Sequence, residues 1–384
     1  MATDVGRSAV TTKLTYLVSH PIQYQAPLLR CVSMEEGIDL RVVFEKQTTG
    51  HAYFDSGFGR MVAWDVPLTD GYQSVMLSGT DLEAEIARAD VLWLHGWQSW
   101  TMRRALVIAR RLGIPVLMRG ENCDLAMPDG RGPRRWLKRS YVGWIFSHCR
   151  AFLAIGSENE KYYRQRGISR ERIFFMPYAV DNETFARKAK AAHPHRDALK
   201  AGLGIAPERK VVIFVGKLLR RKCPDVLARA VARAQWPNEK PALVFVGEGA
   251  MEGRLRALAP DAVFLGFKNQ GALPALYDMA DVLVLPSRRE PWGLVVNEAM
   301  ACGTAVIVSN QVGCAADLVK DRCGSVFPAG DVEALTGALV KCLDKADAMG
   351  EAAAAEIRRW SFAEDVQGLK QAIRFARSSD DGTS

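Results

Sequence analysis

The chain alternates short apolar runs with longer amphipathic stretches along most of its length. Runs such as Lys13–Ser19 and Asp281–Ser287 are short, apolar and bounded by polar or turn residues, which predicts buried β-strands. Stretches such as Phe362–Arg377 place apolar residues three and four apart, which predicts helices with one buried face. Regular alternation of strands and helices is typical of α/β proteins with parallel sheets.

The alternation stops once, at the polar segment Asp181–Arg209, and then starts again. A chain of 384 residues is too long for one ordinary core, so we expect two domains. The predicted fold class is α/β with two doubly wound, Rossmann-like domains, the first covering residues 1–185 and the second residues 186–360.

Polar and aromatic side chains follow several predicted strands of the first half. In doubly wound sheets the loops after the carboxyl ends of the strands face the ligand crevice, so we expect these side chains to point at a site. The simpler alternative is that the histidines are satisfied by nearby backbone groups and the tryptophan is ordinary packing. The residues are His20, Gln23, His95, Trp97, Arg119 and Glu121.

The segment Thr48–Pro67 is long, irregular and rich in glycine and aromatic residues. A long loop in a compact domain is more often functional than not. Its aromatic residues either line a binding groove or pack into a small satellite core. They are Tyr53, Phe54, Phe58 and Trp64.

The stretch Arg289–Gly303 carries the clearest chemistry of the second half. It predicts a short helix whose first-turn amides have no partners within the helix, and such amides bind anions. Glu290 precedes this helix and Glu298 lies inside it, and a carboxylate accepts hydrogen bonds from sugar hydroxyls. An anion-binding position between two hydroxyl acceptors suits a nucleotide-sugar. The alternative is an ordinary buried helix with a solvated Glu290.

Two glutamates eight residues apart, around Pro291-Trp292-Gly293-Leu294 and followed by Ala299-Met300-Ala301-Cys302-Gly303, resemble the donor-site motif of the family-4 retaining glycosyltransferases with the GT-B fold. The resemblance implies two facing domains and transfer of a hexosyl group from a nucleoside diphosphate sugar to a hydroxyl, with retained configuration. It also implies that residues 361–384 form a helix crossing back to the first domain, followed by a disordered tail.

The resemblance assigns roles to individual residues. Lys217 and Lys222 match the two basic positions at the diphosphate, the Phe267-Lys268 loop lies by the nucleobase, Glu290 holds the donor sugar and Glu298 the ribose. The complete implied donor site is Gly216, Lys217, Lys222, Gly247, Phe267, Lys268, Glu290, Pro291, Trp292, Gly293, Leu294, Val295 and Glu298.

The first half departs from the family's pattern near the reacting carbon. Some relatives carry a histidine after the strand that corresponds to Ile114–Met118, where this chain has Arg119 and Glu121, so His95 is the alternative candidate. The catalytic candidates are Glu290, His95 and Arg119. The expected acceptor-side residues are His20, Gln23, His95, Trp97 and Glu121.

Charge and composition add few constraints. The formal net charge of +8 favours an anionic partner. The basic, aromatic helix predicted at Arg131–Phe146 suits either an anionic lipid surface or a solvated outer face, and no nucleic-acid motif accompanies it. We therefore expect a nucleotide-sugar donor, a sugar or lipid-linked acceptor, no nucleic acid, and peripheral membrane contact as one alternative.

Location and cofactors follow from what the sequence lacks. Met1–Thr12 has no apolar core of a signal peptide, and the eight cysteines form no Cys-x-x-Cys pair, so we expect a cytoplasmic protein with free thiols. The chain has no Asp-x-Asp, so we expect no catalytic metal, and no cofactor beyond the nucleotide-sugar as co-substrate.

Three other functions stay open at this stage. A sugar-nucleotide epimerase or phosphorylase of the same fold would use the same donor site, and a noncatalytic binder would hold the donor without turnover. A dinucleotide-dependent oxidoreductase would use Gly247 and Gly249, although the next predicted strand, Ala262–Leu265, ends without the acid that usually holds the ribose.

Overall fold

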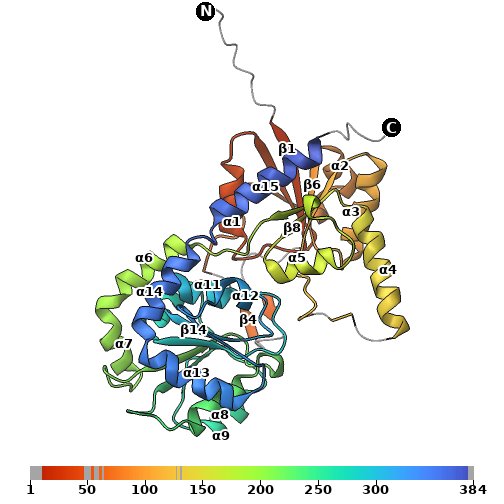
Figure 1. Cartoon of the computed structure of the whole chain (residues 1–384). Helices are drawn as coiled ribbons and strands as arrows, with labels where there is room; N and C mark the ends of the chain where they lie inside the picture. The colour runs from red at the N-terminus through yellow and green to blue at the C-terminus, as the bar shows by residue number, and fades with distance from the viewer. Residues whose placement is uncertain are drawn as a thin grey trace, which may run out of the picture.

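The computed structural model describes residues 11–46, 53–55, 60–62, 65–126, 128–129 and 132–378. Two large sheets dominate it, each flanked by helices (Figure 1). A two-stranded hairpin, β3 (Tyr53–Asp55) and β4 (Arg60–Val62), lies outside both sheets. The aromatic side chains expected in the segment Thr48–Pro67 fall outside the description: Tyr53, Phe54, Phe58 and Trp64.

The first sheet is entirely parallel and has the strand order β5-β2-β1-β6-β7-β8-β9. Its central strands are buried on both faces, which is why their sequences are continuous apolar runs and do not alternate. The strands are β1 (Thr12–Val18), β2 (Ile38–Phe44), β5 (Gln73–Met76), β6 (Val91–His95), β7 (Val116–Arg119), β8 (Ala151–Ala154) and β9 (Ile173–Phe175).

The helices of the first half connect these strands. The longer ones begin where the sequence offers a cap or a proline: Ser99 accepts a hydrogen bond from the Met102 amide at the start of α3, and Pro133 begins α4. They are α1 (Ala26–Ser33), η1 (Leu77–Gly79), α2 (Leu82–Ala87), α3 (Trp100–Arg111), α4 (Pro133–Ser147), α5 (Ser157–Arg164) and η2 (Arg170–Arg172).

The second sheet is also entirely parallel, with the order β12-β11-β10-β13-β14-β15. Its strands are β10 (Val211–Val215), β11 (Ala242–Val246), β12 (Val263–Phe264), β13 (Val282–Leu285), β14 (Ala305–Ser309) and β15 (Gly324–Phe327). Its helices are α8 (Pro224–Arg233), α9 (Glu252–Leu258), α10 (Leu273–Met279), α11 (Leu294–Ala301), α12 (Ala315–Leu318), α13 (Val332–Asp344) and α14 (Ala346–Ile357), with the turn η4 (Arg220–Lys222).

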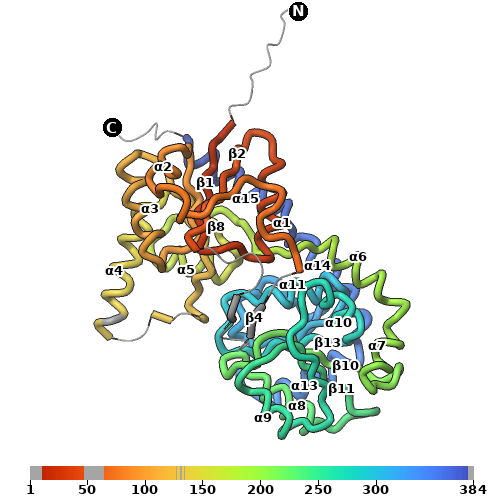
Figure 2. The backbone as a smooth tube through the Cα atoms, turned by 180° about the vertical axis from the view of Figure 1, so that it is seen from behind, coloured from red at the N-terminus to blue at the C-terminus, as the bar shows by residue number. Residues whose placement is uncertain are grey.

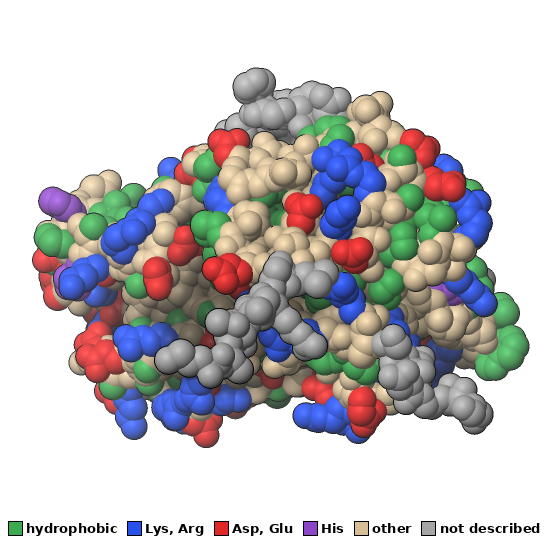
Figure 3. All heavy atoms as spheres, turned by 90° about the horizontal axis from the view of Figure 1, so that it is seen from above, with side chains coloured by type: hydrophobic (Ala, Val, Ile, Leu, Met, Phe, Trp, Pro, Cys, Tyr) green, Lys and Arg blue, Asp and Glu red, His purple; other side chains and the backbone are tan. Residues whose placement is uncertain are grey.

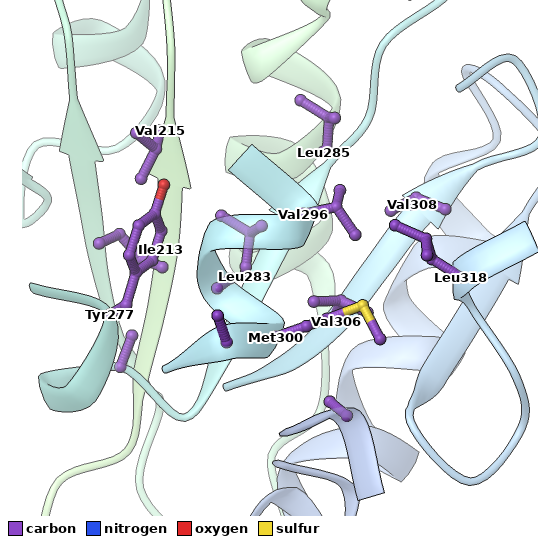
Figure 4. Packing of buried hydrophobic residues seen from close by; sticks show 14 of the residues in the cluster. Ile213, Val215, Tyr277, Leu283, Leu285, Val296, Met300, Val306, Val308 and Leu318 are labelled. Atoms are coloured by element: carbon purple, nitrogen blue, oxygen red, sulfur yellow. The ribbon is translucent and has the colours of Figure 1, made fainter. Parts of the chain in front are cut away.

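Helix α11 packs into the apolar face of the second sheet. Figure 4 shows Val296 and Met300 of this helix among strand side chains such as Leu283, Leu285 and Val306. All five are fully buried. Burial of an aliphatic side chain contributes roughly 1.5–3 kcal/mol, so this packing fixes the helix and the loop that precedes it.

The polar segment that separates the two halves is helical. It forms α6 (Asn182–Ala192), η3 (His193–His195) and α7 (Arg196–Gly202), and these helices contact α10 and α11. Only a few of its side chains are buried, Phe185, Ala189 and Lys200 among them, which explains why its sequence appears as a polar link.

The last helix, α15 (Phe362–Arg377), returns to the first sheet. It packs against β8, β9 and α1, and Figures 1 and 2 show it beside the first strands of the chain. Gly368 permits this approach, because a Cβ atom there would lie 1.8 Å from the carbonyl oxygen of Phe175. The two doubly wound sheets confirm the predicted fold class, whereas the domain boundaries drawn from the sequence stay predictions.

None of the helices in the described ranges combines the length and the apolar character needed to span a bilayer.

Candidate functional site: a cavity between the two sheets

A cavity of about 700 Å³ lies between the two halves of the chain. Residues from both sheets line it, although they are far apart in sequence. From the first half these are Ser19, His20, Ile22, Gln23, Tyr24, Glu45, Lys46, His95, Gly96, Gln98, Ser99, Met102, Gly120, Glu121 and Asn122. From the second half they are Gly216, Lys217, Arg221, Lys222 and Pro291.

The lining from the first half, which we call the polar wall, comes from the loops that follow parallel strands. Ser19 and His20 follow β1, Glu45 follows β2, His95 ends β6 and Glu121 follows β7. Because β1 and β6 are neighbours in the sheet but connect in opposite directions, the loops diverge there and leave a crevice. Four of the six side chains expected to point at one site line this cavity, and Trp97 and Arg119 do not: the four are His20, Gln23, His95 and Glu121.

The lining from the second half contains three cations, Lys217, Arg221 and Lys222, which we call the basic wall. Lys217 follows β10, and the other two belong to the turn η4. Three positive side chains that converge on one hollow of this size are suited to a diphosphate.

Glu290 is held at the edge of the basic wall. Its side chain forms an ion pair with the Lys222 ammonium and lies 4.0 Å from the Arg221 guanidinium. The residue is 8% exposed, and its backbone bridges to Val312. The carboxylate can accept hydrogen bonds from sugar hydroxyls, while Lys222 offsets its charge.

Glu298 lies inside α11 and is buried. Its Oε2 accepts a hydrogen bond of 2.7 Å from the Tyr277 hydroxyl. Burial raises the pKa of Glu298 to about 7, while the bond from Tyr277 acts in the opposite direction. The group is not among those that line the cavity, and its predicted contact with a ribose stays a prediction.

The start of α11 has the geometry expected from the sequence. Gly293 has φ +101°, and a Cβ atom there would lie 2.9 Å from Leu285. Within the described residues no backbone hydrogen bond is made by the amides of Gly293, Leu294 or Val295. These amides are therefore available to an anion.

Trp292 is not in the cavity. It is 3% exposed, and its indole nitrogen donates to Asn297 at 2.9 Å. Its ring packs at 5.3 Å from Trp360, and Gly156 of the first half approaches so closely that a Cβ atom there would lie 2.2 Å from it. Trp292 therefore packs at the junction of the two halves, and no direct contact with a donor in this cavity is available to it.

The glycines near the basic wall serve close packing. Gly247 has φ +129°, and a Cβ atom on it would lie 2.1 Å from the carbonyl oxygen of Gly216. Gly216 itself lines the cavity. The loop containing Phe267 and Lys268 follows β12 and does not line the cavity. Its Phe267 amide donates a hydrogen bond of 3.2 Å to Glu248.

The two histidines of the polar wall carry no charge at neutral pH. Burial, together with the nearby Arg119 and His20, lowers the pKa of His95 to about 3, and burial beside Lys46 lowers the pKa of His20. His95 Nδ1 lies 2.9 Å from the Tyr16 hydroxyl, and no described residue hydrogen-bonds its Nε2. His95 can therefore offer one ring nitrogen to a ligand.

Arg119 is a structural partner of the last helix. It is 1% exposed, forms an ion pair of 2.9 Å with the buried Asp365 of α15, and donates to the carbonyl of Pro177 at 3.1 Å. It does not line the cavity, so the geometry offers no route for the direct catalytic contact proposed from the sequence.

Glu121 and Trp97 have different surroundings. Glu121 Oε1 accepts hydrogen bonds from Tyr24 at 3.0 Å and Tyr178 at 2.5 Å, and the residue lines the cavity. Trp97 is half-buried, packs edge-on against Tyr141 at 5.9 Å and lies against the apolar core, in agreement with the packing alternative.

The structure thus places only part of the predicted site at the cavity. Lining the cavity are His20, Gln23, His95, Glu121, Gly216, Lys217, Lys222 and Pro291, with Glu290 bonded to Lys222. Outside the lining are Trp97, Arg119, Gly247, Phe267, Lys268, Trp292, Gly293, Leu294, Val295 and Glu298.

Several lining residues were missed from the sequence. Arg221 appears in the sequence as part of a solvated turn, yet it lines the cavity beside Lys222. Glu45 and Lys46 follow β2 as His20 follows β1, so the rule that loops after parallel strands face the ligand was sufficient to find them. No local pattern marks Tyr24 or Asn122.

Comparison with known families covers both halves of the chain. Residues 34–179 match the model described as a glycosyl transferase 4-like domain, and residues 195–356 match that of the glycosyl transferases group 1. A D-inositol 3-phosphate glycosyltransferase of Segniliparus rotundus is 26% identical over 306 residues, covering 74% of this chain and 65% of the relative. The enzyme of the same name from Jonesia denitrificans is 29% identical over 258 residues, covering 62% of this chain and 58% of the relative.

Solved structures with the same fold align over nearly the whole chain. The Anabaena protein HepE in complex with UDP and glucose has a TM-score of 0.68 at 16% identity, covering 94% of this chain and 99% of that one. The lipopolysaccharide outer core galactosyltransferase WaaB has a TM-score of 0.66 at 14% identity, with the same coverage. Since two glycosyltransferase family models together span both halves of the chain, and the solved structures share its fold, the protein belongs to the glycosyltransferases with the GT-B fold.

Proposed function

We propose that the protein is a retaining glycosyltransferase that moves a hexosyl group from a nucleoside diphosphate sugar to a hydroxyl group. The observation that carries this is the convergence of Lys217, Arg221 and Lys222 on one cavity with His95 and Glu121 of the other sheet. The HepE structures, solved with UDP and with UDP-glucose, support a nucleotide-sugar donor.

In the proposed reaction the bond between the sugar carbon and the diphosphate breaks, and a bond from that carbon to the acceptor oxygen forms on the same face. The acceptor proton passes to the departing diphosphate oxygen, so no protein nucleophile is required. Lys217 and Lys222 stabilise the charge that develops on the diphosphate, because cations already in position need little reorganisation during the reaction.

Glu290 has two tasks in this scheme. It accepts hydrogen bonds from the hydroxyls of the donor sugar, and it holds Lys222 in position through their ion pair. When a diphosphate binds, Lys222 shares its charge between the phosphate and Glu290. Each charge-assisted hydrogen bond contributes about 1.5–3 kcal/mol, so two or three of them suffice for a micromolar dissociation constant.

The test is a screen of radiolabelled nucleotide-sugars for binding, hydrolysis and transfer, beginning with UDP-glucose. We expect release of the nucleoside diphosphate and acceleration by a sugar acceptor. A requirement for free phosphate would indicate a phosphorylase, and conversion of the donor sugar without an acceptor would indicate an epimerase. Tight binding of a nicotinamide dinucleotide would contradict the proposal.

We also propose that the outer face of α3 and α4 contacts an anionic membrane, as a lipid-linked acceptor requires. Each of the two helices contains four basic residues and no acidic residue. They lie side by side, since Arg103 donates to the Tyr141 hydroxyl at 3.0 Å. Large apolar side chains are exposed on this face: Trp100, Val107, Trp136, Leu137, Tyr141 and Trp144.

The position of this face fits an acceptor held in a membrane. Ser99, the N-cap of α3, and Met102, in its first turn, line the cavity, while Trp100 between them is 69% exposed. In Figure 3 apolar side chains gather at the right edge, the side on which Figure 1 shows α3 and α4. Basic residues combined with exposed aromatic rings are typical of surfaces that lie on anionic lipid.

Flotation with vesicles tests the membrane contact. We expect the protein to bind vesicles that contain phosphatidylglycerol, not pure phosphatidylcholine, and to release them in high salt. The double variant Trp136→Ser/Trp144→Ser should bind about tenfold more weakly, whereas Met34→Ser, which removes an exposed side chain just after α1, should bind normally. Equal binding of both vesicle types would rule out the anionic contact.

A further inference from the structure

The two walls of the cavity carry opposite charge. The basic wall contributes Lys217, Arg221 and Lys222 and no acidic lining residue. In the polar wall the described lining residues include two carboxylates, Glu45 and Glu121, against a single ammonium group on Lys46. The charge of the cavity therefore changes sign across the gap between the sheets.

The histidines do not alter this balance. His20 and His95 line the polar wall, and burial lowers the pKa of both groups below the usual range of histidine. Near neutral pH both rings are uncharged and act only as hydrogen-bond partners. An anionic group placed against the polar wall would meet Glu45 and Glu121, while Lys46 is the one cation among the described lining residues of this wall. The buried Arg119 behind the wall is paired with Asp365.

Glu121 is held in a fixed position. Both tyrosine hydroxyls, from Tyr24 and Tyr178, donate to its Oε1, and no hydrogen bond to its Oε2 is made by any described residue. Tyr178 is itself packed at 5.1 Å beneath the guanidinium of Arg119, which is tied to Asp365. One carboxylate oxygen is thus fixed by the protein and the other is left for a hydrogen-bond donor on a ligand.

Other polar atoms of the same wall also lack partners. Asn122 is 1% exposed, and neither its Oδ1 nor its Nδ2 has a hydrogen-bond partner in the described part of the chain. The same holds for the buried Oε2 of Glu45. Buried polar groups of folded proteins are almost always paired, so several unpaired ones beside one cavity indicate a ligand with many hydrogen-bonding groups.

We infer that the acceptor is an uncharged sugar or polyol, whose hydroxyl donates to Glu121 Oε2, and that the polar wall disfavours acceptors bearing phosphate or carboxylate at the reacting end. A hydroxyl both donates and accepts, so it can serve carboxylate and amide groups together. The inference rests on the proposed transfer reaction and adds the chemical class of its second substrate.

Electrostatic repulsion by Glu45 and Glu121 would discriminate against phosphorylated acceptors. A phosphate carries nearly two negative charges, and placing it near two carboxylates costs free energy that a neutral sugar does not meet. Partners are often selected by such unfavourable contacts as well as by favourable ones. We therefore expect a preference of about tenfold or more in kcat/KM for the neutral member of a matched pair.

The experiment measures transfer from UDP-glucose, or from the donor that binds most tightly, to a panel of matched acceptors. The panel contains methyl glucosides, methyl mannosides, methyl galactosides and inositol, each beside its monophosphate. We expect transfer to one or more neutral members, at a rate at least about tenfold above that of the corresponding phosphate.

Substitution of Glu121 connects the preference to this residue. Glu121→Gln should raise the KM of the neutral acceptor about tenfold, leave the KM of the donor unchanged, and reduce the preference over phosphorylated acceptors. Glu351→Gln, an exposed glutamate of α14, is the matched control and should change none of these values.

Two results would overturn the inference. One is faster transfer to a phosphorylated member, with loss of that transfer in Lys46→Ala, which would mean that Lys46 binds the phosphate. The other is binding and hydrolysis of the donor without acceleration by any neutral member. Failure to bind any nucleotide-sugar is a different result, because it would contradict the proposed function itself.

Discussion

The basic wall and the polar wall of the cavity are built in different ways. The cations of the basic wall come from one short stretch, Lys217–Lys222, and its neighbour Glu290 comes from one loop. The polar wall is assembled from the ends of β1, β2, β6 and β7 and the start of α3, so its members are spread over about 100 residues.

In the proposed function the two walls bind different substrates, the basic wall the donor and the polar wall the acceptor. The diphosphate of every nucleotide-sugar has the same charge and shape, so a short basic segment and a helix start can recognise it. An acceptor varies from one enzyme to the next, and single loops on a constant scaffold can change to fit it. Substitutions on the two walls should therefore affect different substrates.

The largest effect is expected at Glu290. Glu290→Gln should lower kcat/KM for transfer about 100-fold or more, about 2.7 kcal/mol, because the neutral amide binds the sugar hydroxyls more weakly in the transition state. The dissociation constant for UDP should stay the same or fall slightly, since Lys222 loses its partner and is more available to phosphate.

Steady-state kinetics and calorimetric titration with UDP check this expectation. Thermal unfolding of the variant serves as the folding control. Transfer at the rate of the unchanged protein would remove Glu290 from the mechanism.

A smaller effect, on UDP affinity alone, is expected to differ between lysine substitutions on the two walls. Lys222→Met should weaken UDP binding about 10- to 100-fold, because one charge-assisted contact of about 1.5–3 kcal/mol is lost. The matched substitution on the polar wall, Lys46→Met, should change UDP affinity by less than about twofold. Titration with UDP at two salt concentrations measures both.

The single variant Lys222→Met also removes the ion-pair partner of Glu290. The Glu290 carboxylate then keeps only Arg221, at 4.0 Å, as a neighbouring cation in the basic wall, so part of the change in UDP affinity could come from lost stability. The double variant Lys222→Met/Glu290→Gln removes both charges and should recover folding stability without recovering UDP affinity. Equal UDP affinities for the two lysine variants would show that the walls do not divide the substrates.

The smallest effect concerns pH and the second glutamate. Because burial raises the pKa of Glu298 to about 7, the group is half protonated near neutral pH. A ribose contact needs the ionised form, so the affinity for UDP should rise severalfold between about pH 6 and pH 8. Glu298→Gln should bind UDP more weakly and lose this pH dependence.

The unliganded protein should respond to pH in the opposite direction. A carboxyl group whose pKa is higher in the folded than in the unfolded chain favours folding at low pH, and this contribution is lost as pH rises through about 7. The free energy of unfolding should therefore fall between about pH 4.5, the ordinary pKa of this group, and about pH 7, and stay level above that. A UDP affinity independent of pH in the unchanged protein would argue against the ribose contact.

The fold and the donor side were largely predictable from the sequence. Parallel strands buried on both faces leave continuous apolar runs, and the strands predicted at Lys13–Ser19, Ile114–Met118 and Asp281–Ser287 agree with β1, β7 and β13 within two residues at each end. Lys217, Lys222 and Glu290 lie in short segments with recognisable spacing, and they come together as the resemblance implied.

Trp292 and Arg119 show where this approach fails. Trp292 belongs to the motif, yet it packs against Trp360 and Gly156 at the junction of the halves. Arg119 follows a strand like the other candidates, yet it turns to Asp365, which is 246 residues away in the chain. Both orientations depend on partners that are distant in sequence, and a local pattern contains no information about them.

The sequence by itself determined most strands of the two large sheets and the segment that carries the cations of the basic wall, because hydrophobic period and charge spacing are local properties of the chain. Only the tertiary structure decided which strand ends share a cavity, that Glu121 keeps one oxygen for a ligand, and that the polar wall is acidic. The physical reason is that charge balance and hydrogen bonding depend on which side chains are close in three dimensions. Residues distant in sequence become neighbours only when the sheets and the last helix have packed.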